Sequence, residues 1–275
     1  MARIGNSEAI LLNKINIGEE ILSQCPSLRY IGVQATGYNV IDIEACRRHN
    51  VTVTNVPSYS TAGVAQLVFA YLSEFACHVQ LHSDSVMAGD WTRAKDFCYW
   101  KVPLMELEGK TLGIFGYGNI GSRVAEIAKS YRMNILVCTR TAKPGIEQVG
   151  FETLLKESDF ITLHAPLTPQ TKEIINKESL PLMKPSAYLI NTARGGLVNE
   201  AAVREALESR RIAGYAADVV LEEPMNERNP LLGAPNCLLT PHIAWAAVET
   251  RQRLLDIVVA NLQAFIAGHP QNVVS

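Results

Sequence analysis

The sequence predicts an α/β protein built on a doubly wound parallel sheet. Two observations point to this class. Short apolar runs alternate with stretches of helical spacing along most of the 275 residues, which is typical of parallel sheets covered by helices. In addition, a glycine-rich G-x-G-x-x-G turn joins one apolar run to one helix near the middle of the chain, as in β-α-β units that bind dinucleotides.

The N-terminal segment alternates strand and helix. We expect strands at Ala9–Asn13, Arg29–Gln34 and Val51–Asn55, with helices around Gly18–Ser23 and within Asn39–Asn50. A long helix should then run from Thr61 to about Met87, because apolar residues recur there with helical spacing. The next stretch, Asp90–Pro103, is rich in aromatic residues and is expected to be a loop that packs against another surface.

The glycine-rich turn lies in the best-defined unit of the chain. The run that begins at Thr111 predicts a buried strand, a helix follows the turn, and Asn134–Cys138 closes the β-α-β unit. Gly116 permits the tight turn, Gly118 lets a pyrophosphate approach the backbone, and Gly121 lets helix and strand pack closely. The motif alone is weak, but its place between strand and helix favours dinucleotide binding over a merely structural turn.

The C-terminal half adds further strands to the same sheet. They are expected at Asp159–Ala165, Ala187–Ala193, Gly214–Val220 and Cys237–His242. Helices are expected at Phe151–Glu157, Lys177–Met183, Glu200–Ser209 (with Asn199 as its cap) and Ala246–Ala267. The sheet then has at least six strands, and its ligand crevice lies at their carboxyl ends.

Composition excludes several classes of function. A net charge of −2 and a pI near 6.3 provide no strong positive field for nucleic acid or a membrane surface. No apolar run is long enough to span a membrane, and the N-terminus lacks the apolar core of a signal peptide. The six cysteines form no C-x-x-C pair or metal-binding spacing, so we expect reduced thiols in a cytoplasmic protein.

Three polar residues follow consecutive predicted strands. Arg194, Glu223 and His242 would therefore converge on one crevice. A histidine can protonate the alkoxide that hydride transfer to a carbonyl produces, a guanidinium can hold a keto-acid carboxylate, and a glutamate can orient the imidazole. Taken singly, they also fit a surface ion pair, a turn residue and a helix cap. His164 follows a strand too, but its proline- and threonine-rich surroundings favour a loop that lines the cofactor.

These residues lie in motifs that resemble a known family, the D-isomer-specific 2-hydroxyacid dehydrogenases, and within it the glycerate dehydrogenase (hydroxypyruvate reductase) branch. The matching motifs are Asn55-Val56-Pro57, LEGKTLGIFGYGNIG (107–121), LHAPLTPQT (163–171), LINTARGGLVNE (189–200), Asp218 with Glu223-Pro224, and NPLL with LTPHIAW (229–245). The resemblance covers nearly the whole chain, and the combination of motifs is specific.

The resemblance implies an oxidoreductase that transfers a hydride between NAD(P)H and a small 2-keto or D-2-hydroxy acid, usually as a homodimer. It implies a Rossmann-type NAD(P)-binding domain at residues 63–243 and a smaller, flavodoxin-like substrate domain at residues 1–62 and 244–275. It makes His242 the acid/base, Glu223 its partner and Arg194 the carboxylate-binding residue. The expected substrate contacts are Ala35, Thr36, Gly37 and Trp245, with Tyr99 and Trp100 as further aromatics on the substrate side. The expected cofactor contacts are Gly116, Gly118, Asn119, Ile120, Gly121, Thr139, Arg140, Thr141, His164, Ala165, Pro166, Thr171, Thr192, Ala193, Asp218 and Ala244.

Two departures from the family pattern matter. NAD-preferring members have an acidic residue after the second strand of the β-α-β unit, where this chain reads Cys138-Thr139-Arg140-Thr141. With Arg140 and Lys143 available for a 2′-phosphate, we expect NADP(H) to be favoured over NAD(H). The family also has a first β-α unit of about forty residues before Ala9, which is absent from this sequence. We expect its absence to leave two strands without partners and to reduce the stability of the substrate domain.

Two other functions remain open at this point. One is a dinucleotide-sensing binding protein with little catalysis, and the other is an inactive, truncated enzyme of the same fold. Among substrates, hydroxypyruvate and glyoxylate come first, whereas pyruvate and bulkier 2-keto acids are alternatives that the sequence does not rank.

Overall fold

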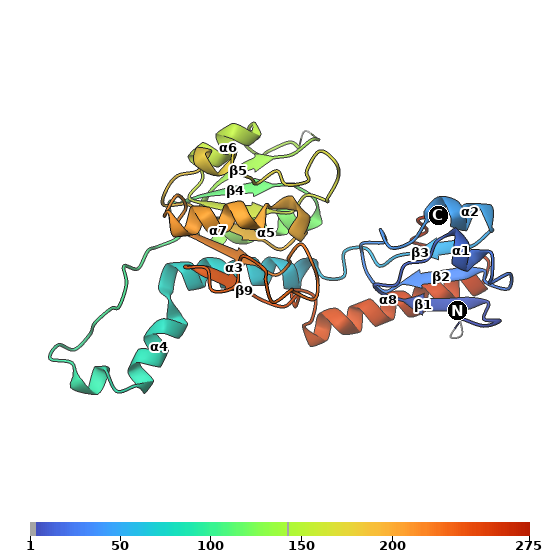
Figure 1. Ribbon diagram of the computed structural model, residues 1–275, viewed down its shortest axis with the longest axis horizontal. Helices are drawn as coiled ribbons and strands as arrows, with labels where there is room; N and C mark the ends of the chain where they lie inside the picture. Colours follow the sequence, from blue (N-terminus) through green and yellow to red (C-terminus); the bar gives the residue numbers. More distant parts are fainter. Residues whose placement is uncertain (1–3, 142) are drawn as a thin grey trace. The chain divides into compact units, whose positions relative to one another are not determined.

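The computed structural model describes residues 4–141 and 143–275 and divides the chain into two compact units (Figure 1). The first unit takes in the residues up to Ser60 together with Trp245–Ser275. The second unit is the continuous segment Thr61–Ala244. The boundaries expected from the sequence lie within two residues of these.

The first unit is a three-stranded parallel sheet with helices. Its elements are β1 (Ala9–Leu12), α1 (Glu19–Leu22), β2 (Tyr30–Val33), α2 (Ile43–Arg48), β3 (Thr52–Thr54) and α8 (Val248–Ile266). The strands pair in the order β1-β2-β3. Each of the three strands therefore has at least one partner. The expectation that two strands of this domain would lack partners is wrong. Helix α8 packs on β2, where the rings of Tyr30 and Phe265 lie 4.7 Å apart.

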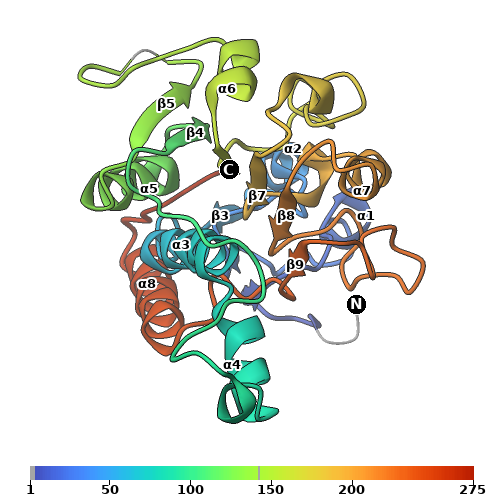
Figure 2. The same ribbon diagram turned by 90° about the vertical axis from the view of Figure 1, so that its left-hand side faces the viewer.

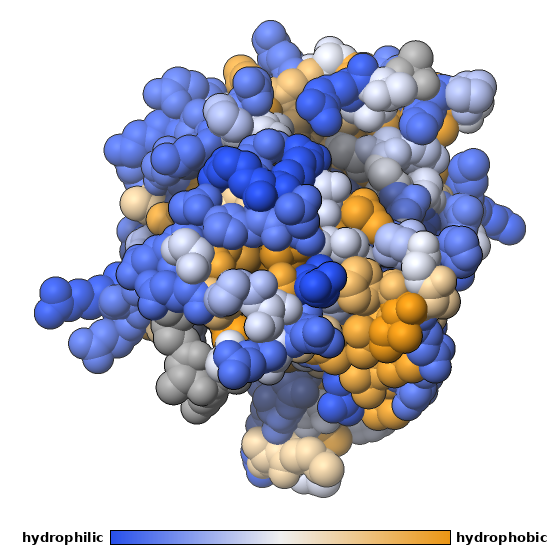
Figure 3. Space-filling model, turned by 90° about the vertical axis from the view of Figure 1, so that its right-hand side faces the viewer, coloured by the Kyte–Doolittle hydropathy of each residue, from blue (hydrophilic) through white to orange (hydrophobic). Residues whose placement is uncertain are grey.

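Two surfaces of the first unit stay apolar and exposed. One face of α8 is buried through Leu254 and Val258. Another face exposes Leu255, Val259 and Ile266 to solvent. Figure 3 shows this exposed face as an orange patch. Strand β1 has a partner on one side only among the described residues, and Leu11 is exposed.

The second unit contains the expected sheet of six parallel strands. They are β4 (Thr111–Phe115), β5 (Asn134–Cys138), β6 (Phe160–Leu163), β7 (Tyr188–Asn191), β8 (Gly214–Ala217) and β9 (Cys237–Leu239). Their order is β5-β4-β6-β7-β8-β9, so the chain runs outward from β4 to β5 and then restarts on the other side of β4. This reversal places a switch point beside the glycine-rich turn.

Helices cover both faces of this sheet (Figure 2). One core cluster packs the sheet against α3 (Thr61–Cys77) and α5 (Asn119–Ser130). The other packs it against α6 (Phe151–Glu157) and α7 (Glu200–Glu208), with the short turns η2 (Leu180–Leu182) and η3 (Gly195–Leu197) nearby. The predicted α/β class, doubly wound, is confirmed.

Two predicted helices differ from the structure. The helix from Thr61 to Met87 is broken at His78, which has a left-handed φ of 46°, into α3 and α4 (Val79–Met87) at 57° to each other. The expected helix Lys177–Met183 is only the turn η2, because Pro181 lacks the N–H that a helix interior needs. Asn199, by contrast, caps α7 as expected, since its side chain accepts a hydrogen bond from the N–H of Ala202 at 3.0 Å.

Helix α4, the turn η1 (Trp91–Arg93) and the loop that leads back to β4 form an arm that projects from the second unit (Figure 1). Ser85 stabilises the arm from within through hydrogen bonds to Asp90 and Tyr99. Its aromatic residues do not pack as expected: Trp91, Phe97 and Trp100 are 53%, 88% and 67% exposed.

The six cysteines are all free, as expected. Over residues 4–141 and 143–275, no single helix has the length and apolar composition needed to cross a membrane. The bent pair α3 and α4 meets that test only when its two helices are combined, and α3 is a core helix of the second unit.

Candidate active site

The glycine-rich turn has the geometry of a phosphate cradle. Gly118 precedes α5, and a Cβ atom added to it would meet nothing within 4 Å. No side chain caps the helix at Gly118, and the amino end of a helix favours a bound anion. Asn119 and Ile120 form the first turn of α5. Gly121 lies against the turn, since its Cβ would approach the carbonyl oxygen of Gly116 to 2.2 Å.

The structure also brings the loop after β6 to this turn. Gly116 has a φ of 95°, and an added Cβ would lie 2.6 Å from the backbone nitrogen of Ala165 and 2.7 Å from the carbonyl carbon of His164. Thr171 closes the loop by donating a hydrogen bond to the carbonyl oxygen of Pro166 at 2.7 Å. These predicted cofactor residues, far apart in sequence, are therefore neighbours.

His164 and His242 have different surroundings. The His164 Nε2 lies 2.9 Å from the hydroxyl of Thr162, and burial lowers the pKa of His164 to about 3. The His242 Nδ1 lies 2.7 Å from Oε2 of Glu223, with both side chains about one-third exposed. His164 is therefore neutral at neutral pH, whereas His242 has a carboxylate partner.

The three proposed catalytic residues follow three adjacent strands. Arg194 follows β7, Glu223 follows β8 and His242 follows β9, at the carboxyl edge of the sheet. The side chain of Asn191 shapes the turn before Arg194, because it donates to the carbonyl oxygen of Arg194 and accepts from the N–H of Ala193. The Arg194 side chain itself is exposed.

Two contacts clamp the loop of Glu223 to the loop of Arg194. A Cβ on Gly195 would lie 2.0 Å from the carbonyl carbon of Val220, so only glycine permits this approach. The buried Glu200 accepts hydrogen bonds from the N–H of Leu221 at 2.7 Å and from the amide of Asn229 at 2.8 Å. Sequence reasoning missed Glu200, because a glutamate in the first turn of a helix is ordinarily exposed.

Asp218 and Ala244, both predicted cofactor contacts, are joined by a hydrogen bond. The Asp218 carboxylate accepts hydrogen bonds from the N–H groups of Ile243 and Ala244 and from the hydroxyl of Thr240. Thr192, next to Ala193, has a buried hydroxyl without a partner among the described residues. At the end of β5, Thr139 is half-buried, and Arg140 and Thr141 are exposed.

The predicted substrate contacts lie in the first unit. The loop of Ala35, Thr36 and Gly37 is held by the segment after β3: Thr36 donates to the carbonyl oxygen of Val56, and Asn55 donates to that of Thr36, both at 2.8 Å. Trp245 packs against a small cluster formed by Val56, Tyr59, Leu254 and Val258.

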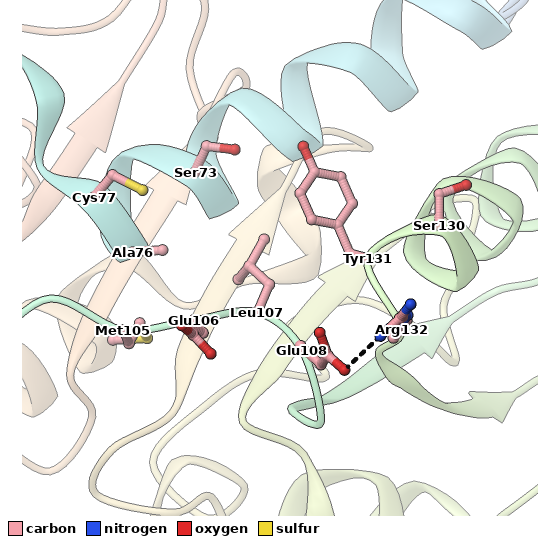
Figure 4. Close-up of a pocket in the computed structure, with 10 residues that line it drawn as sticks. All are labelled: Ser73, Ala76, Cys77, Met105, Glu106, Leu107, Glu108, Ser130, Tyr131 and Arg132. Carbon is pink, nitrogen blue, oxygen red and sulfur yellow. Dashed lines mark hydrogen bonds and ion pairs between the residues drawn. The ribbon is translucent and has the colours of Figure 1, made fainter.

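A hollow in the second unit lies elsewhere and is not part of this site. It is formed by the end of α3, the segment before β4 and the end of α5, and a Glu108–Arg132 ion pair crosses it (Figure 4). It lies before the first residues of β4 and β5, hence at the amino edge of the sheet. Over residues 4–141 and 143–275, no group of three or more potential ligands could hold a metal ion.

Comparison with known proteins decides the family. Residues 69–244 match the model for the NAD-binding domain of the D-isomer-specific 2-hydroxyacid dehydrogenases. The chain belongs to this family. The resemblance expected from the sequence is thereby confirmed.

Similar members of the dehydrogenase family cover the whole chain. A hydroxypyruvate reductase from Blautia hydrogenotrophica is 42% identical over 100% of this chain and 87% of its own length. A glycerate dehydrogenase from Methylorubrum extorquens is 43% identical over 99% and 87%. Among solved structures, an acyclic imino acid reductase in complex with NADPH and D-Arg is 31% identical, with a TM-score of 0.89 over 100% of this chain and 87% of that one.

A nicotinamide dinucleotide fits the residues present in this dehydrogenase. Gly118 and the uncapped end of α5 provide an open place for the pyrophosphate. The Thr192 hydroxyl, which has no hydrogen-bond partner in the described part of the chain, lies just beyond β7, at the same edge of the sheet. An orphaned polar group at a ligand site is expected where the ligand supplies the missing bond.

Proposed function

We propose that the chain interconverts small 2-keto acids and D-2-hydroxy acids with a nicotinamide coenzyme, with hydroxypyruvate/D-glycerate or glyoxylate/glycolate as its substrates. The 2.7 Å contact between His242 and Glu223, at the carboxyl edge of a sheet that fits a dinucleotide, carries this proposal. The curated relatives named hydroxypyruvate reductase and glycerate dehydrogenase support the substrate class.

The proposed roles follow from charge and geometry. A bound nicotinamide would supply the hydride. Arg194 holds the substrate carboxylate through its fixed donors, and His242 gives a proton to the alkoxide oxygen during reduction. Glu223 accepts from Nδ1 of His242, which directs Nε2 toward the substrate, and stabilises the positive ring.

Substitution of the acid/base tests the function. His242→Gln should lower kcat by about 10²–10⁴-fold, because a positioned proton donor contributes that much, while leaving coenzyme affinity within a few-fold. Activity should be measured with hydroxypyruvate, glyoxylate and pyruvate, and coenzyme affinity by fluorescence titration. Full activity in His242→Gln would exclude the proposed mechanism, and coenzyme binding without turnover in the unsubstituted protein would favour a sensor.

We also propose that the enzyme prefers NADP(H) to NAD(H). No carboxylate follows β5 directly, and neither Arg140 nor Lys143 forms an ion pair with any residue that the structure describes. Both cations are thus available to a 2′-phosphate. Thr139→Asp should move the ratio of kcat/KM toward NADH by at least about tenfold, with the uncharged Thr139→Asn as a matched control. A preference for NADH in the unsubstituted enzyme contradicts the proposal.

We propose further that the enzyme is a cytoplasmic homodimer that forms through its arm. The exposed Trp91, Phe97 and Trp100 present apolar area that the second unit itself does not cover. Replacing Phe97 and Trp100 by Ser should shift the mass found by light scattering from dimer to monomer, whereas Leu255→Ser on α8 should not. A monomeric unsubstituted protein rules out the dimer.

The six free thiols suit the reducing cytoplasm, and cell fractionation tests this location.

A further inference from the structure

A buried hydroxyl on α3 is linked to the turn that carries His242. The Tyr71 hydroxyl lies 2.5 Å from Oγ1 of Thr240, and that Oγ1 lies 2.5 Å from Oδ1 of Asp218. All three residues belong to the second unit. The proposed reaction assigns Tyr71 no role, and in the sequence it is one member of the apolar stripe of a helix.

The direction of these hydrogen bonds is fixed by the number of protons. The Asp218 carboxylate only accepts, so Thr240 uses its single hydroxyl proton on Asp218. Tyr71 must therefore donate to Thr240. Burial raises the pKa of Tyr71, which keeps this donor protonated over the working pH range. The order of donation is Tyr71 to Thr240 to Asp218.

Asp218 in turn holds the backbone next to His242. Its Oδ1 accepts from the N–H of Ile243 at 2.7 Å and its Oδ2 from the N–H of Ala244 at 2.8 Å. These two residues follow His242, whose φ of 54° is in the left-handed region that is unfavourable for a side chain with a Cβ. On the other side, the N–H of His242 donates to the carbonyl oxygen of Thr240 at 3.0 Å.

We propose that Tyr71 is a positioning residue for His242, acting through Thr240 and Asp218. The hydrogen bonds hold the turn from Thr240 to Ala244 in the one conformation that keeps the imidazole beside Glu223. Chains of hydrogen bonds polarise and strengthen one another in a buried setting, so a hydroxyl on α3 influences a turn that it does not touch. The proposal rests on the proposed function, in which His242 is the proton donor.

The test removes single hydroxyl groups and measures turnover with the full-length enzyme. Tyr71→Phe and Thr240→Val should each lower kcat about 5-fold, the rate equivalent of one hydrogen bond. Thr240→Ser keeps the hydroxyl and should restore most of kcat. The double variant should be no slower than Thr240→Val alone, since both changes break one chain. Tyr188→Phe is the matched control, because its hydroxyl has no hydrogen-bond partner among the described residues.

The solvent isotope effect on kcat separates positioning from a structural role. A loosened proton donor makes proton transfer more rate-limiting, so the effect should rise in Tyr71→Phe and Thr240→Val. An unchanged isotope effect, with kcat falling only in proportion to the folded fraction, would overturn the proposal, as would additive losses in the double variant. His242→Gln keeps the two proposals distinct. If it abolishes turnover while Tyr71→Phe and Thr240→Val behave as the unsubstituted enzyme, the positioning proposal is contradicted and the proposed function is not.

Discussion

The two histidines at strand ends show how surroundings assign roles to identical residues. His242 has a carboxylate at 2.7 Å, whereas His164 has only the hydroxyl of Thr162 at 2.9 Å. A carboxylate stabilises the protonated ring, but burial without one disfavours it. The preference for His242 over His164 as the acid/base stays a prediction, and the different partners of the two rings support it.

The low pKa of His164 predicts acid sensitivity. The folded state keeps this ring neutral down to about pH 3, while the unfolded chain protonates it near pH 6.5, so stability is full above pH 6.5 and is lost as the pH falls toward 3. At pH 5 we expect His164 to lower the free energy of unfolding by about 1 kcal/mol. A fully buried histidine ring would lower it by roughly 2 kcal/mol, but the ring of His164 is only half-buried.

Urea unfolding of the unsubstituted protein and of His164→Asn at pH 7.5 and pH 5 checks this prediction. The variant should lose less stability between the two pH values. His269→Asn, at an exposed position after α8, serves as the control. Equal losses in all three proteins would show that His164 does not titrate in this range.

At the residue scale, sequence reasoning proposed the reacting side chains but not the residues that hold them in place. Arg194, Glu223 and His242 were recognisable because their types and their places after strands suit one reaction. Tyr71, Thr240 and Glu200 were not, since their roles depend on burial and on partners more than twenty residues away in the chain. A tyrosine within an apolar stripe looks like core, and only the structure shows what its hydroxyl contacts.

At the element scale, the glycines of the β4–α5 turn have separable roles. Gly121→Ala should destabilise the protein by about 2 kcal/mol, because the new methyl group would collide with the carbonyl of Gly116. Gly118→Ala should leave stability within about 0.5 kcal/mol, since its φ of −86° suits alanine and the space is open. The same methyl group should weaken coenzyme binding at least tenfold by occupying the phosphate position.

Thermal unfolding and fluorescence titration of the two variants test these roles. Destabilisation in Gly118→Ala, or tight coenzyme binding by that variant, would contradict the assignment of its open space to the ligand.

Helix α8 offers adjacent valines with opposite surroundings. Val258 is 4% exposed and Val259 is 53% exposed. Val258→Ala should cost about 2 kcal/mol of unfolding free energy, and Val259→Ala no more than about 0.5 kcal/mol. Chemical denaturation measures both. A comparable cost at Val259 would mean that its face is covered in solution.

Apolar periodicity located most of the elements but not their interruptions. The six strands of the large sheet were predicted because buried parallel strands read as continuous apolar runs. The break at His78 was not predicted, because histidine carries no strong signal for a left-handed turn, and the apolar residues continue across it. Tertiary contacts decide such positions.

At the scale of the whole molecule, the two units differ in how fully their sheets are covered. The six-stranded sheet has helices and a buried cluster on each face. The three-stranded sheet has an edge strand, β1, with exposed side chains. We expect the amides of β1 and β2 to exchange with solvent at lower opening free energy than those of β6 and β7.

Hydrogen exchange followed by mass spectrometry, with and without coenzyme, tests this difference. Coenzyme should slow exchange in β4, β6 and α5 and leave β1 unchanged. Protection of β1 and β2 at the level of global unfolding would show that the two units unfold together.

The discontinuous first unit also has a consequence for the order of events during synthesis. Its sheet depends on residues made last: Phe265 packs on Tyr30, Asn261 donates to the carbonyl of Asn55, and the N–H of Val274 donates to the carbonyl of Val53. The continuous second unit has every strand it needs once Ala244 has left the ribosome. We therefore expect the nascent chain to form the six-stranded sheet of the second unit before α8, which packs on the sheet of the first unit, has been synthesised.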